Sequence, residues 1–261
     1  MSSQPIAVIT GGASGIGKEL VRLYILDHLV IALDLSQESL ESLKEEFPGV
    51  IALSCDVSKL EELKTVAEKI ISSYGTPTIW FNNAGIAVVE SFREFDLEKF
   101  DQVLKVNING VVYGTRVAME KMGEEGVIVN MASVNGYIPA PYMTAYGASK
   151  HAVVGFTAGL QQELEIEKSS LRVVLVAPGF VETPIVHAAD KLIQNPLFEK
   201  FRSQPETVAA EIKSGIESGK GTIFPTLNGK LMIQLNKLSP QMLAKGGRFF
   251  LSKNWKDFFK S

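Results

Sequence analysis

Short runs of β-branched and other apolar residues alternate along the chain with longer segments of helical period. The short runs predict seven β-strands at Ile6–Thr10, Val30–Asp34, Val50–Ser54, Thr78–Asn82, Val127–Met131, Arg172–Ala177 and Thr222–Pro225. An alternation of buried strands and amphipathic helices is typical of a parallel sheet with helices on both faces. The pattern therefore predicts an α/β fold with a doubly wound, Rossmann-type sheet of seven parallel strands.

The segments between the strands carry apolar stripes. Apolar residues recur every three or four positions in the segments 40–47, 60–70 and 142–167. Each of these segments is predicted to be a helix. Ser58 and Glu61 stand just before the second segment in the order of a capping box, which marks a helix start.

Length and composition bound the protein class. A chain of 261 residues with 46% hydrophobic and 21% charged residues has the composition of one soluble α/β domain. No apolar run reaches the roughly 20 residues that span a bilayer, and no signal peptide precedes the first strand. We therefore expect a cytoplasmic protein. The single cysteine, Cys55, excludes an intramolecular disulfide and a thiolate metal cluster, and we expect no metal site.

Charge is uneven along the chain. The net charge of -3 gives no general attraction to nucleic acid, so a nucleic-acid partner is not expected. The last 35 residues nevertheless hold seven basic side chains and one acidic one. These are Lys230, Lys237, Lys245, Arg248, Lys253, Lys256 and Lys260, with Asp257. Many apolar residues lie between them.

Two interpretations of this C-terminal segment remain open. A cationic amphipathic segment can lie on an anionic membrane surface, or it can pack on its own domain or on another subunit. Glycine and proline interrupt any single long amphipathic helix, which favours packing. We therefore expect residues 1–226 to form a dinucleotide-binding and catalytic domain, and residues 227–261 to form a packed extension.

A glycine-rich turn follows the first strand and precedes an amphipathic segment. Its sequence is T-G-G-A-S-G-I-G at residues 10–17. Glycines let a pyrophosphate approach main-chain N–H groups at the positive end of a helix. The spacing differs from the common G-x-G-x-x-G pattern, and a tight turn without a ligand is the alternative. The candidate cofactor contacts in this turn are Gly11, Ser14, Gly15, Ile16 and Gly17.

Asp34 ends the second strand, where a carboxylate can accept hydrogen bonds from the adenosine ribose. The carboxylate repels the 2′-phosphate of NADP, and the following Leu35 and Ser36 offer no positive charge. NAD is therefore favoured over NADP, with helix capping as the alternative role of Asp34. Asp56 and Val57 follow the third strand and are candidates for contact with adenine, with ordinary helix entry as their alternative.

Tyr146 and Lys150 are four residues apart in a predicted helix, so their side chains share one face. A phenol with a pKa of about 10 is a weak acid–base catalyst at neutral pH. A lysine at about 4 Å favours the phenolate by about 4 kcal/mol at an effective dielectric constant near 20, before desolvation is subtracted. The pair can therefore form one acid–base site, although in an arbitrary helix such a pair is usually only half-exposed surface.

Two further polar residues point to the same place. Ser133 follows the strand Val127–Met131, and ligands bind at the carboxyl ends of strands in doubly wound sheets. Asn107 lies within the apolar segment Val103–Val112, where an amide needs a hydrogen-bonding partner.

In the order and spacing of these motifs the chain resembles the short-chain dehydrogenase/reductase family of about 250 residues. The resemblance extends from Ile6 to about Pro225. It depends on T-G-G-A-S-G-I-G at 10–17, N-N-A-G at 82–85, Asn107, Ser133, Y-G-A-S-K at 146–150 and P-G at 178–179.

The resemblance implies a role for each matching residue. Tyr146 is implied as the general acid/base and Ser133 as a hydrogen-bonding partner of the same substrate oxygen. Lys150 is implied to bind the nicotinamide ribose and to bias Tyr146, and Asn107 to hold a water molecule in a proton relay. The remaining implied cofactor contacts are Asn83, Ala84, Gly85, Pro178, Gly179, Val181 and Thr183. A structural turn is the alternative role for both groups of loop residues.

The resemblance also implies a mobile lid over the substrate at about residues 184–206 and a homodimer or homotetramer. The lid is largely apolar, which favours an apolar secondary alcohol or ketone as substrate. The resulting hypothesis is an NAD-dependent oxidoreductase. The alternatives are an NADP-dependent carbonyl or 3-oxoacyl reductase and, in another class, a non-catalytic protein that senses nucleotides.

Overall fold

The fold is built on one parallel sheet, seen in a computed structural model that describes residues 4–185 and 202–241. Its strand order is β3-β2-β1-β4-β5-β6-β7, and every neighbouring pair is parallel. The strands are β1 (Ile6–Thr10), β2 (Leu29–Asp34), β3 (Ile51–Ser54), β4 (Ile79–Asn82), β5 (Val127–Met131), β6 (Arg172–Val176) and β7 (Thr222–Ile223). The predicted seven-stranded, doubly wound sheet is confirmed.

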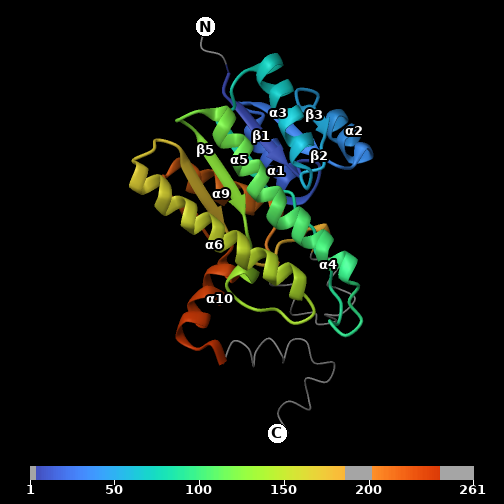
Figure 1. Ribbon diagram of the computed structural model, residues 1–261, viewed down its shortest axis with the longest axis vertical. Coiled ribbons are helices and arrows are strands. Elements are labelled where there is room, and N and C mark those ends of the chain that lie inside the picture. Colours follow the sequence, from blue (N-terminus) through green and yellow to red (C-terminus); the bar gives the residue numbers. More distant parts are fainter. Residues whose placement is uncertain (1–3, 186–201, 242–261) are drawn as a thin grey trace.

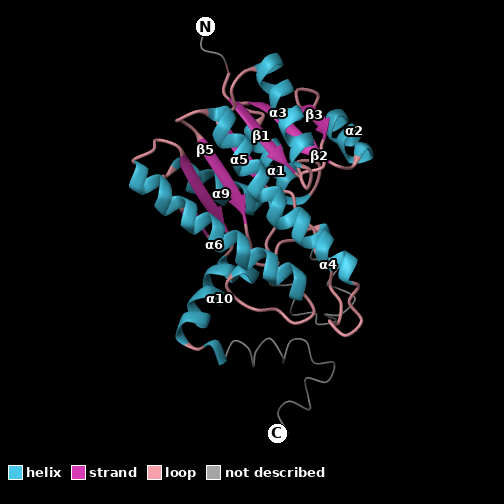
Figure 2. Ribbon diagram, viewed as in Figure 1, coloured by secondary structure: helices cyan, strands magenta, loops and turns pink. Residues whose placement is uncertain are grey.

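Helices cover both faces of this sheet (Figures 1 and 2). The α-helices are α1 (Gly15–Tyr24), α2 (Gln37–Glu46), α3 (Leu60–Tyr74), α4 (Leu97–Leu104), α5 (Gly110–Met122), α6 (Thr144–Glu167), α9 (Pro205–Glu217) and α10 (Leu227–Leu238). A π-helical turn, η1 (Lys105–Asn109), joins α4 to α5, and a short 3₁₀ helix, η2 (Val134–Gly136), follows β5. Helices α3, α5 and α6 lie on the face toward the viewer, and α1 and α9 lie on the other.

The alternation of side chains along β1 explains the two layers. Ala7 and Ile9 face a core formed with α1 and α9, whereas Ile6 and Val8 face a core formed with α3 and α5. Successive residues of a strand point to opposite faces, so a strand that is apolar at every position needs cover on both sides. All five β1 residues are buried, which agrees with a central strand.

The strand order reverses direction between β1 and β4, which lie side by side. The chain leaves β1 toward β2 on one side and leaves β4 toward β5 on the other. The loops that follow β1 and β4 therefore diverge at the carboxyl edge of the sheet, where ligands bind in doubly wound folds.

Two local predictions are corrected. The Ser58/Glu61 capping box is wrong, because Lys59 occupies the N-cap of α3 and makes no side-chain capping bond. The Ser58 hydroxyl, which was expected to cap the helix, donates instead to Asp56 Oδ1 at 2.7 Å. The helix predicted from residue 142 begins at Thr144, since Tyr142 has a φ of 64° and cannot continue it.

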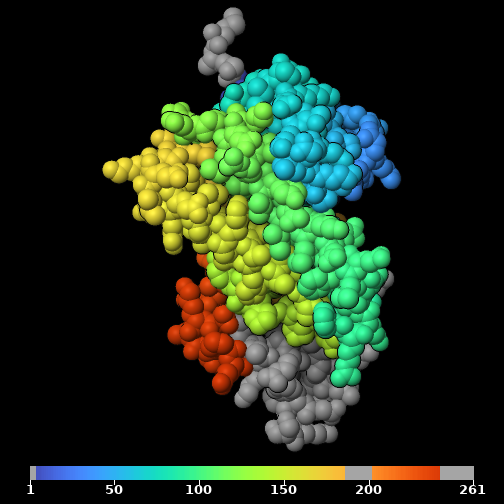
Figure 3. All heavy atoms as spheres, in the orientation of Figure 1, coloured from blue at the N-terminus to red at the C-terminus, as the bar shows by residue number. Residues whose placement is uncertain are grey.

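Helix α10 forms the described part of the C-terminal segment. Ile233 is buried in a small core with Val134, the first residue of η2, and Ile138, which follows it. Leu227 and Leu238 lie on the surface, each 82% exposed. In the space-filling view α10 lies below α6 at one end of the molecule (Figure 3). The division into residues 1–226 and 227–261 stays a prediction, as does membrane contact, and residues 242–261 lie outside the described part.

Candidate active site

The glycine turn after β1 has the backbone that its sequence predicts. Gly11 and Gly15 have φ values of 62° and 51°, a region that side chains disfavour. A Cβ atom on Gly17 would lie 2.0 Å from Gly11 O, so the turn closes too tightly for any side chain. Ser14 is the N-cap of α1 but makes no side-chain capping bond. The first N–H groups of α1 are therefore not satisfied by this side chain and can bind an anion.

Thr10 fastens the glycine turn to the end of β4. Its Oγ1 donates to Phe81 O at 3.1 Å and accepts from the N–H groups of Asn83 and Ala84, both at 3.0 Å. Asn83 Nδ2 donates in return to Thr10 O at 3.0 Å and Gly11 O at 3.1 Å. The predicted residues Gly11, Asn83 and Ala84 are thus brought together. Thr10 was not predicted as a site residue, although it opens the glycine motif.

Asp34 lies against the glycine turn. Its Oδ2 accepts from Ala13 N at 3.2 Å, and its Oδ1 accepts from Ser36 N at 3.1 Å. The alternative role as a helix cap is wrong, because Ser36 caps α2 by accepting from Ser39 N. Leu35 is 69% exposed beside it.

The two candidates after β3 differ in what they can offer. Asp56 Oδ1 accepts from Ser58 N at 3.0 Å, which fixes the carboxylate at the surface end of the loop. The Val57 side chain is buried against Gly110, where an added Cβ atom would lie 2.9 Å from Val57 Cγ2. Any contact of Val57 with a cofactor would therefore involve its main chain.

The segment after β6 closes the other side of the glycine turn. A Cβ atom on Gly15 would lie 3.2 Å from Thr183 Cγ2, so these two predicted residues are neighbours. Val181 is buried in the core and pairs with Ser203 in an isolated bridge. This bridge joins the two ends of the expected lid. Residues 186–201 of the lid lie outside the described part of the chain.

Pro178 and Gly179 connect this segment to two other elements. Pro178 O accepts from Val134 N at 2.8 Å and from Ser133 Oγ at 3.4 Å. Gly179 N donates to Thr226 Oγ1 at 2.9 Å, and Thr226 is the N-cap of α10. The turn is therefore held from the β5 side and from the α10 side.

Ser133, Tyr146 and Lys150 converge at the carboxyl end of β5. All three are buried, with 7%, 8% and 3% of their surface exposed. The Ser133 and Tyr146 hydroxyls are hydrogen-bonded, and Lys150 Nζ lies 5.6 Å from the centre of the Tyr146 ring. Lys150 Nζ also donates to Met131 O, the last residue of β5, at 2.8 Å. Ser133 thus stands at the start of η2, Tyr146 and Lys150 lie on α6, and the end of β5 holds the lysine.

Burial determines the acidity of this pair. It lowers the pKa of Lys150 to about 8, because the buried ammonium loses its hydration. Burial also raises the pKa of Tyr146 above its ordinary value, and the hydrogen bond with Ser133 opposes the rise. The favourable effect of Lys150 was predicted before desolvation was subtracted, and in the isolated protein desolvation of the phenolate is the larger effect on the pKa of Tyr146.

Asn107 lies in the π-helical turn η1 and is fully buried. Its side chain accepts from Ile86 N at 2.8 Å and donates to Ile86 O at 2.9 Å and Ser149 Oγ at 3.0 Å. Ser149 Oγ in turn donates to Tyr146 O at 2.7 Å. The amide therefore fastens the loop after β4 to the helix that carries the triad. Its role in a water relay stays a prediction.

Gly85 brings that loop close to the triad. A Cβ atom on Gly85 would lie 3.5 Å from Lys150 Nζ and 3.3 Å from Asn107 Oδ1. The N-A-G part of the motif thus reaches from the glycine turn, through Asn83, to the lysine.

A buried polar network behind the site was not predicted. Asn82 Nδ2 donates to Asn130 Oδ1 at 2.8 Å and to Thr115 Oγ1 at 3.1 Å, and Trp80 Nε1 donates to Asn82 Oδ1 at 2.9 Å. Asn130 Nδ2 donates to Thr157 Oγ1 at 3.2 Å. The network ties β4 and β5 to α5 and α6. Asn82 belongs to the N-N-A-G motif, whose resemblance to the family implied a role in bracing the sheet, and no local pattern marks the other members.

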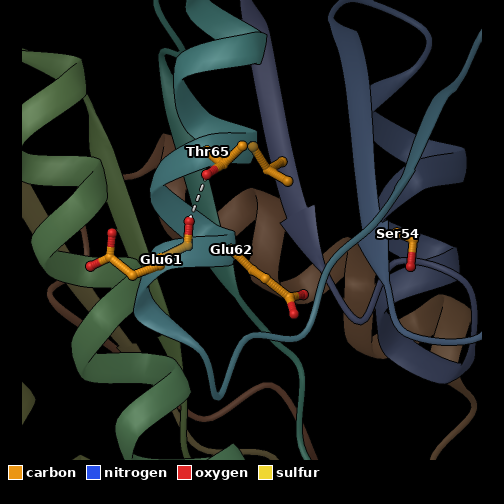
Figure 4. Close-up of a pocket in the computed structure, with 5 residues that line it drawn as sticks. Ser54, Glu61, Glu62 and Thr65 are labelled. Atoms are coloured by element: carbon orange, nitrogen blue, oxygen red, sulfur yellow. Dashed lines mark hydrogen bonds between the residues drawn. The ribbon is translucent and has the colours of Figure 1, made fainter.

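A separate hollow of about 290 Å³ lies beside β3 and α3 and is lined by Ser54, Glu61, Glu62, Thr65 and Val66 (Figure 4). Glu62 points toward the Ser54 side and Glu61 points away, while Thr65 Oγ1 donates to Glu61 O. Its acidic lining does not suit phosphate groups, and none of the triad residues contributes to it.

Other types of site are not seen in residues 4–185 and 202–241. Within these ranges no three histidine, cysteine or acidic side chains lie together in a way that could hold a metal. Within the same ranges no helix is long and apolar enough to cross a membrane.

Comparisons with known proteins identify the family of the chain. Residues 5–193 match the family described as short chain dehydrogenase. The chain is 30% identical over 251 residues to mouse 15-hydroxyprostaglandin dehydrogenase (NAD+), with 87% of this chain and 88% of the relative covered. It is 38% identical over 218 residues to the 3-oxoacyl-(acyl-carrier-protein) reductase of Thermotoga maritima, covering 79% and 88%.

A solved structure shares the fold. It is a short chain dehydrogenase/reductase from Burkholderia phymatum in complex with NAD, with a TM-score of 0.82 and 26% identity over 92% of this chain and 95% of that one. Sequence motifs, sheet topology and these relatives agree, and the chain belongs to the short-chain dehydrogenase/reductase family of oxidoreductases.

Proposed function

We propose that this protein is an NAD-dependent dehydrogenase that interconverts an apolar secondary alcohol and its ketone. The observation that carries the proposal is the convergence of Ser133, Tyr146 and Lys150 in one buried site at the carboxyl edge of the sheet. The same edge holds the glycine turn, so a dinucleotide at the turn can extend toward the triad.

The residues present fit a dinucleotide. The absence of side chains at Gly11, Gly15 and Gly17 leaves main-chain N–H groups open to a pyrophosphate, and Thr183 faces Gly15 across the turn. Asp34 stands beside the turn with a carboxylate suited to ribose hydroxyls and unsuited to a 2′-phosphate. The candidate contacts Gly85, Pro178 and Gly179 would flank the nicotinamide end. When bound, NAD supplies the hydride acceptor or donor.

The protein supplies orientation and proton transfer. In alcohol oxidation the Tyr146 phenolate takes the hydroxyl proton while Ser133 hydrogen-bonds the same oxygen and fixes its position. Lys150 stabilises the phenolate by its positive charge, and Met131 O holds the ammonium in place. In ketone reduction the Tyr146 phenol returns the proton to the developing alkoxide. Burial excludes water, which strengthens each of these interactions.

An apolar substrate is supported by the apolar lid sequence and by the mouse relative, whose name specifies a hydroxyprostaglandin and NAD. A second candidate is an NADP-dependent carbonyl or 3-oxoacyl reductase, and the relative from Thermotoga maritima, whose name specifies a 3-oxoacyl-(acyl-carrier-protein) reductase, supports its substrate class. Fluorescence titration with NADH and NADPH separates the two, since tighter binding of NADPH would contradict the Asp34 argument.

Family membership also supports a homodimer or homotetramer, which light scattering coupled to size-exclusion chromatography measures. The expected cytoplasmic location stays a prediction.

Replacement of Tyr146 by Phe tests the mechanism. With a panel of apolar secondary alcohols and NAD, Tyr146→Phe is expected to lose about 10³-fold in kcat/KM while it retains NADH binding. Tyr74→Phe is the matched control, because Tyr74 ends α3 and is 37% exposed. Retained turnover in Tyr146→Phe contradicts the mechanism. Wild-type protein that binds NADH but oxidises or reduces no member of the panel favours the non-catalytic nucleotide-sensing alternative.

A further inference from the structure

We propose that Asn135 is a specificity-determining residue that hydrogen-bonds a second hydroxyl group on the substrate. The proposal rests on the proposed function and narrows its substrate class to apolar secondary alcohols that carry another hydroxyl. No sequence motif marks this residue, and its proposed role is inferred from its surroundings in the fold.

Asn135 lies in η2, two residues after Ser133, and is 5% exposed. Its main-chain N–H donates to Ser133 Oγ at 3.2 Å. Its side-chain Nδ2 donates to the thioether sulfur of Met143 at 3.6 Å. Met143 is the N-cap of α6 and precedes Tyr146 by three residues, so the two lie on the same side of the first helical turn. Asn135 is thus held between Ser133, through its main chain, and the first turn of the helix that carries Tyr146, through its side-chain amide.

The hydrogen bonds available to this amide are poor. A thioether is a weak acceptor, and within the described part of the chain Asn135 Oδ1 accepts no hydrogen bond. Its immediate neighbours Val134 and Ile138 are buried and apolar. Asn135 Oδ1 is not one of the fully buried polar atoms that lack a partner, so it keeps some accessible surface within a side chain that is otherwise buried. A hydrogen-bond donor from outside the chain can therefore reach it.

The position of the amide suits a substrate group better than a structural role. By contrast, the buried amides of Asn82 and Asn107 make strong bonds at both ends to backbone or side-chain groups. Both of those amides fasten elements of the fold together, whereas Asn135 reaches only a sulfur. Its free Oδ1 requires a donor, which a hydroxyl supplies and a ketone or ether does not.

A hydroxyl bound at Asn135 would orient the substrate. The reacting carbinol must face Ser133 and Tyr146, and a second fixed point selects one of the rotations that an alkyl chain otherwise samples. Substrates that lack the second hydroxyl leave Oδ1 unpaired, so the site discriminates against them.

The test compares one alcohol with its hydroxylated analogues. The probes are 2-octanol and octanediols that keep the 2-hydroxyl and carry the other at carbon 4, 5, 6 or 7. For each protein kcat/KM with NAD is measured, and the value for the best diol is divided by that for 2-octanol. In Asn135→Leu, which is close in size but apolar, this ratio is expected to fall by about tenfold or more. Asn135→Ala provides the same comparison without filling the site.

Three outcomes bear on the proposal. A reduced ratio in both variants, with NADH affinity retained as evidence of an intact cofactor site, supports it. An unchanged ratio, with both substrates equally impaired or equally active, overturns it and leaves Asn135 a packing residue. If wild-type protein oxidises no alcohol in a Tyr146-dependent way, the proposed function itself fails and the inference falls with it. If oxidation depends on Tyr146 but the ratio is unchanged, the role of Asn135 is contradicted while the proposed function stands.

Discussion

The Lys150 ammonium is hydrogen-bonded to the sheet and not to the Tyr146 phenol: its Nζ donates to Met131 O at 2.8 Å and lies 5.6 Å from the centre of the Tyr146 ring. The end of β5 therefore sets the distance between the two groups. Because both groups are buried, the charged form of each is disfavoured: the pKa of Tyr146 is raised and that of Lys150 is lowered.

The proximity of the two groups predicts the pH profile of alcohol oxidation. Below the Lys150 pKa of about 8 the pair holds two protons, and the phenol cannot act as a base. As the pH rises through about 8 one proton leaves, and the remaining proton can reside on the lysine and leave Tyr146 as phenolate. We expect kcat/KM for oxidation to rise about tenfold per pH unit below pH 8 and to level above it.

A lysine replacement checks the origin of this profile. In Lys150→Met the phenol must ionise alone, and burial raises its pKa. The plateau of the oxidation profile is then expected to move above pH 10, along with a lower rate. A plateau that stays near pH 8 in Lys150→Met would show that another group controls the profile.

Alanine variants of two glycines distinguish an effect on cofactor binding from an effect of backbone strain on stability. Gly15 and Gly123 both have positive φ values, 51° and 74°, but only Gly15 has a close neighbour, Thr183. Both alanine variants are expected to lose about 1–2 kcal/mol of stability. Only Gly15→Ala is expected to weaken NADH binding, by tenfold or more in a fluorescence titration. Equal affinities in the two variants would remove the turn from the cofactor site.

We expect the polar network behind the site to stabilise the folded protein. Thr157→Val removes the acceptor of Asn130 Nδ2 and leaves a buried N–H group unpaired, which costs about 1–3 kcal/mol. Thr65→Val is the same change on exposed α3, and it is expected to cost less than about 0.5 kcal/mol. Urea unfolding of both variants measures the difference. Similar losses would mean that the network contributes little.

The charge of Asp34 makes a prediction about cofactor choice. Asp34→Asn keeps the size of the side chain and removes the charge that repels a 2′-phosphate. The ratio of NADH affinity to NADPH affinity is expected to fall by about tenfold, measured by fluorescence titration. Glu38→Gln on α2 is a control for general charge, since Glu38 lies in the first turn of the next helix. An equal shift in both variants would contradict a specific role for Asp34.

Sequence patterns predicted the sheet closely because a strand buried on both faces is apolar at nearly every position. The strand limits of Ile6–Thr10 and Val127–Met131 agree with β1 and β5. The triad was also predictable, because Tyr146 and Lys150 are neighbours on one helix. Their resemblance to a known family extended the prediction to Ser133, which lies thirteen residues earlier.

Features formed between distant segments were not predictable in this way. Thr10 meets Asn83 across 73 residues, and Asn130 meets Thr157 across 27. Nothing in either local sequence states the partner. The effect of desolvation on the pKa of Tyr146 was left open for a related reason, because a distance to a cation can be predicted from spacing but the extent of burial depends on the whole fold.

The contact between Thr226 and Gly179 has a practical consequence for experiments on the C-terminal segment. Thr226 Oγ1 accepts from both Gly179 N and Gly229 N, so one hydroxyl belongs to the cofactor-side turn and to the start of α10 at once. A chain shortened at residue 225 would lose that hydroxyl and uncover Val134 beside Ser133. Loss of turnover in such a truncation would then report damage to the reaction centre, so point substitutions at Leu231 or Leu238 are the cleaner probes of what the tail binds.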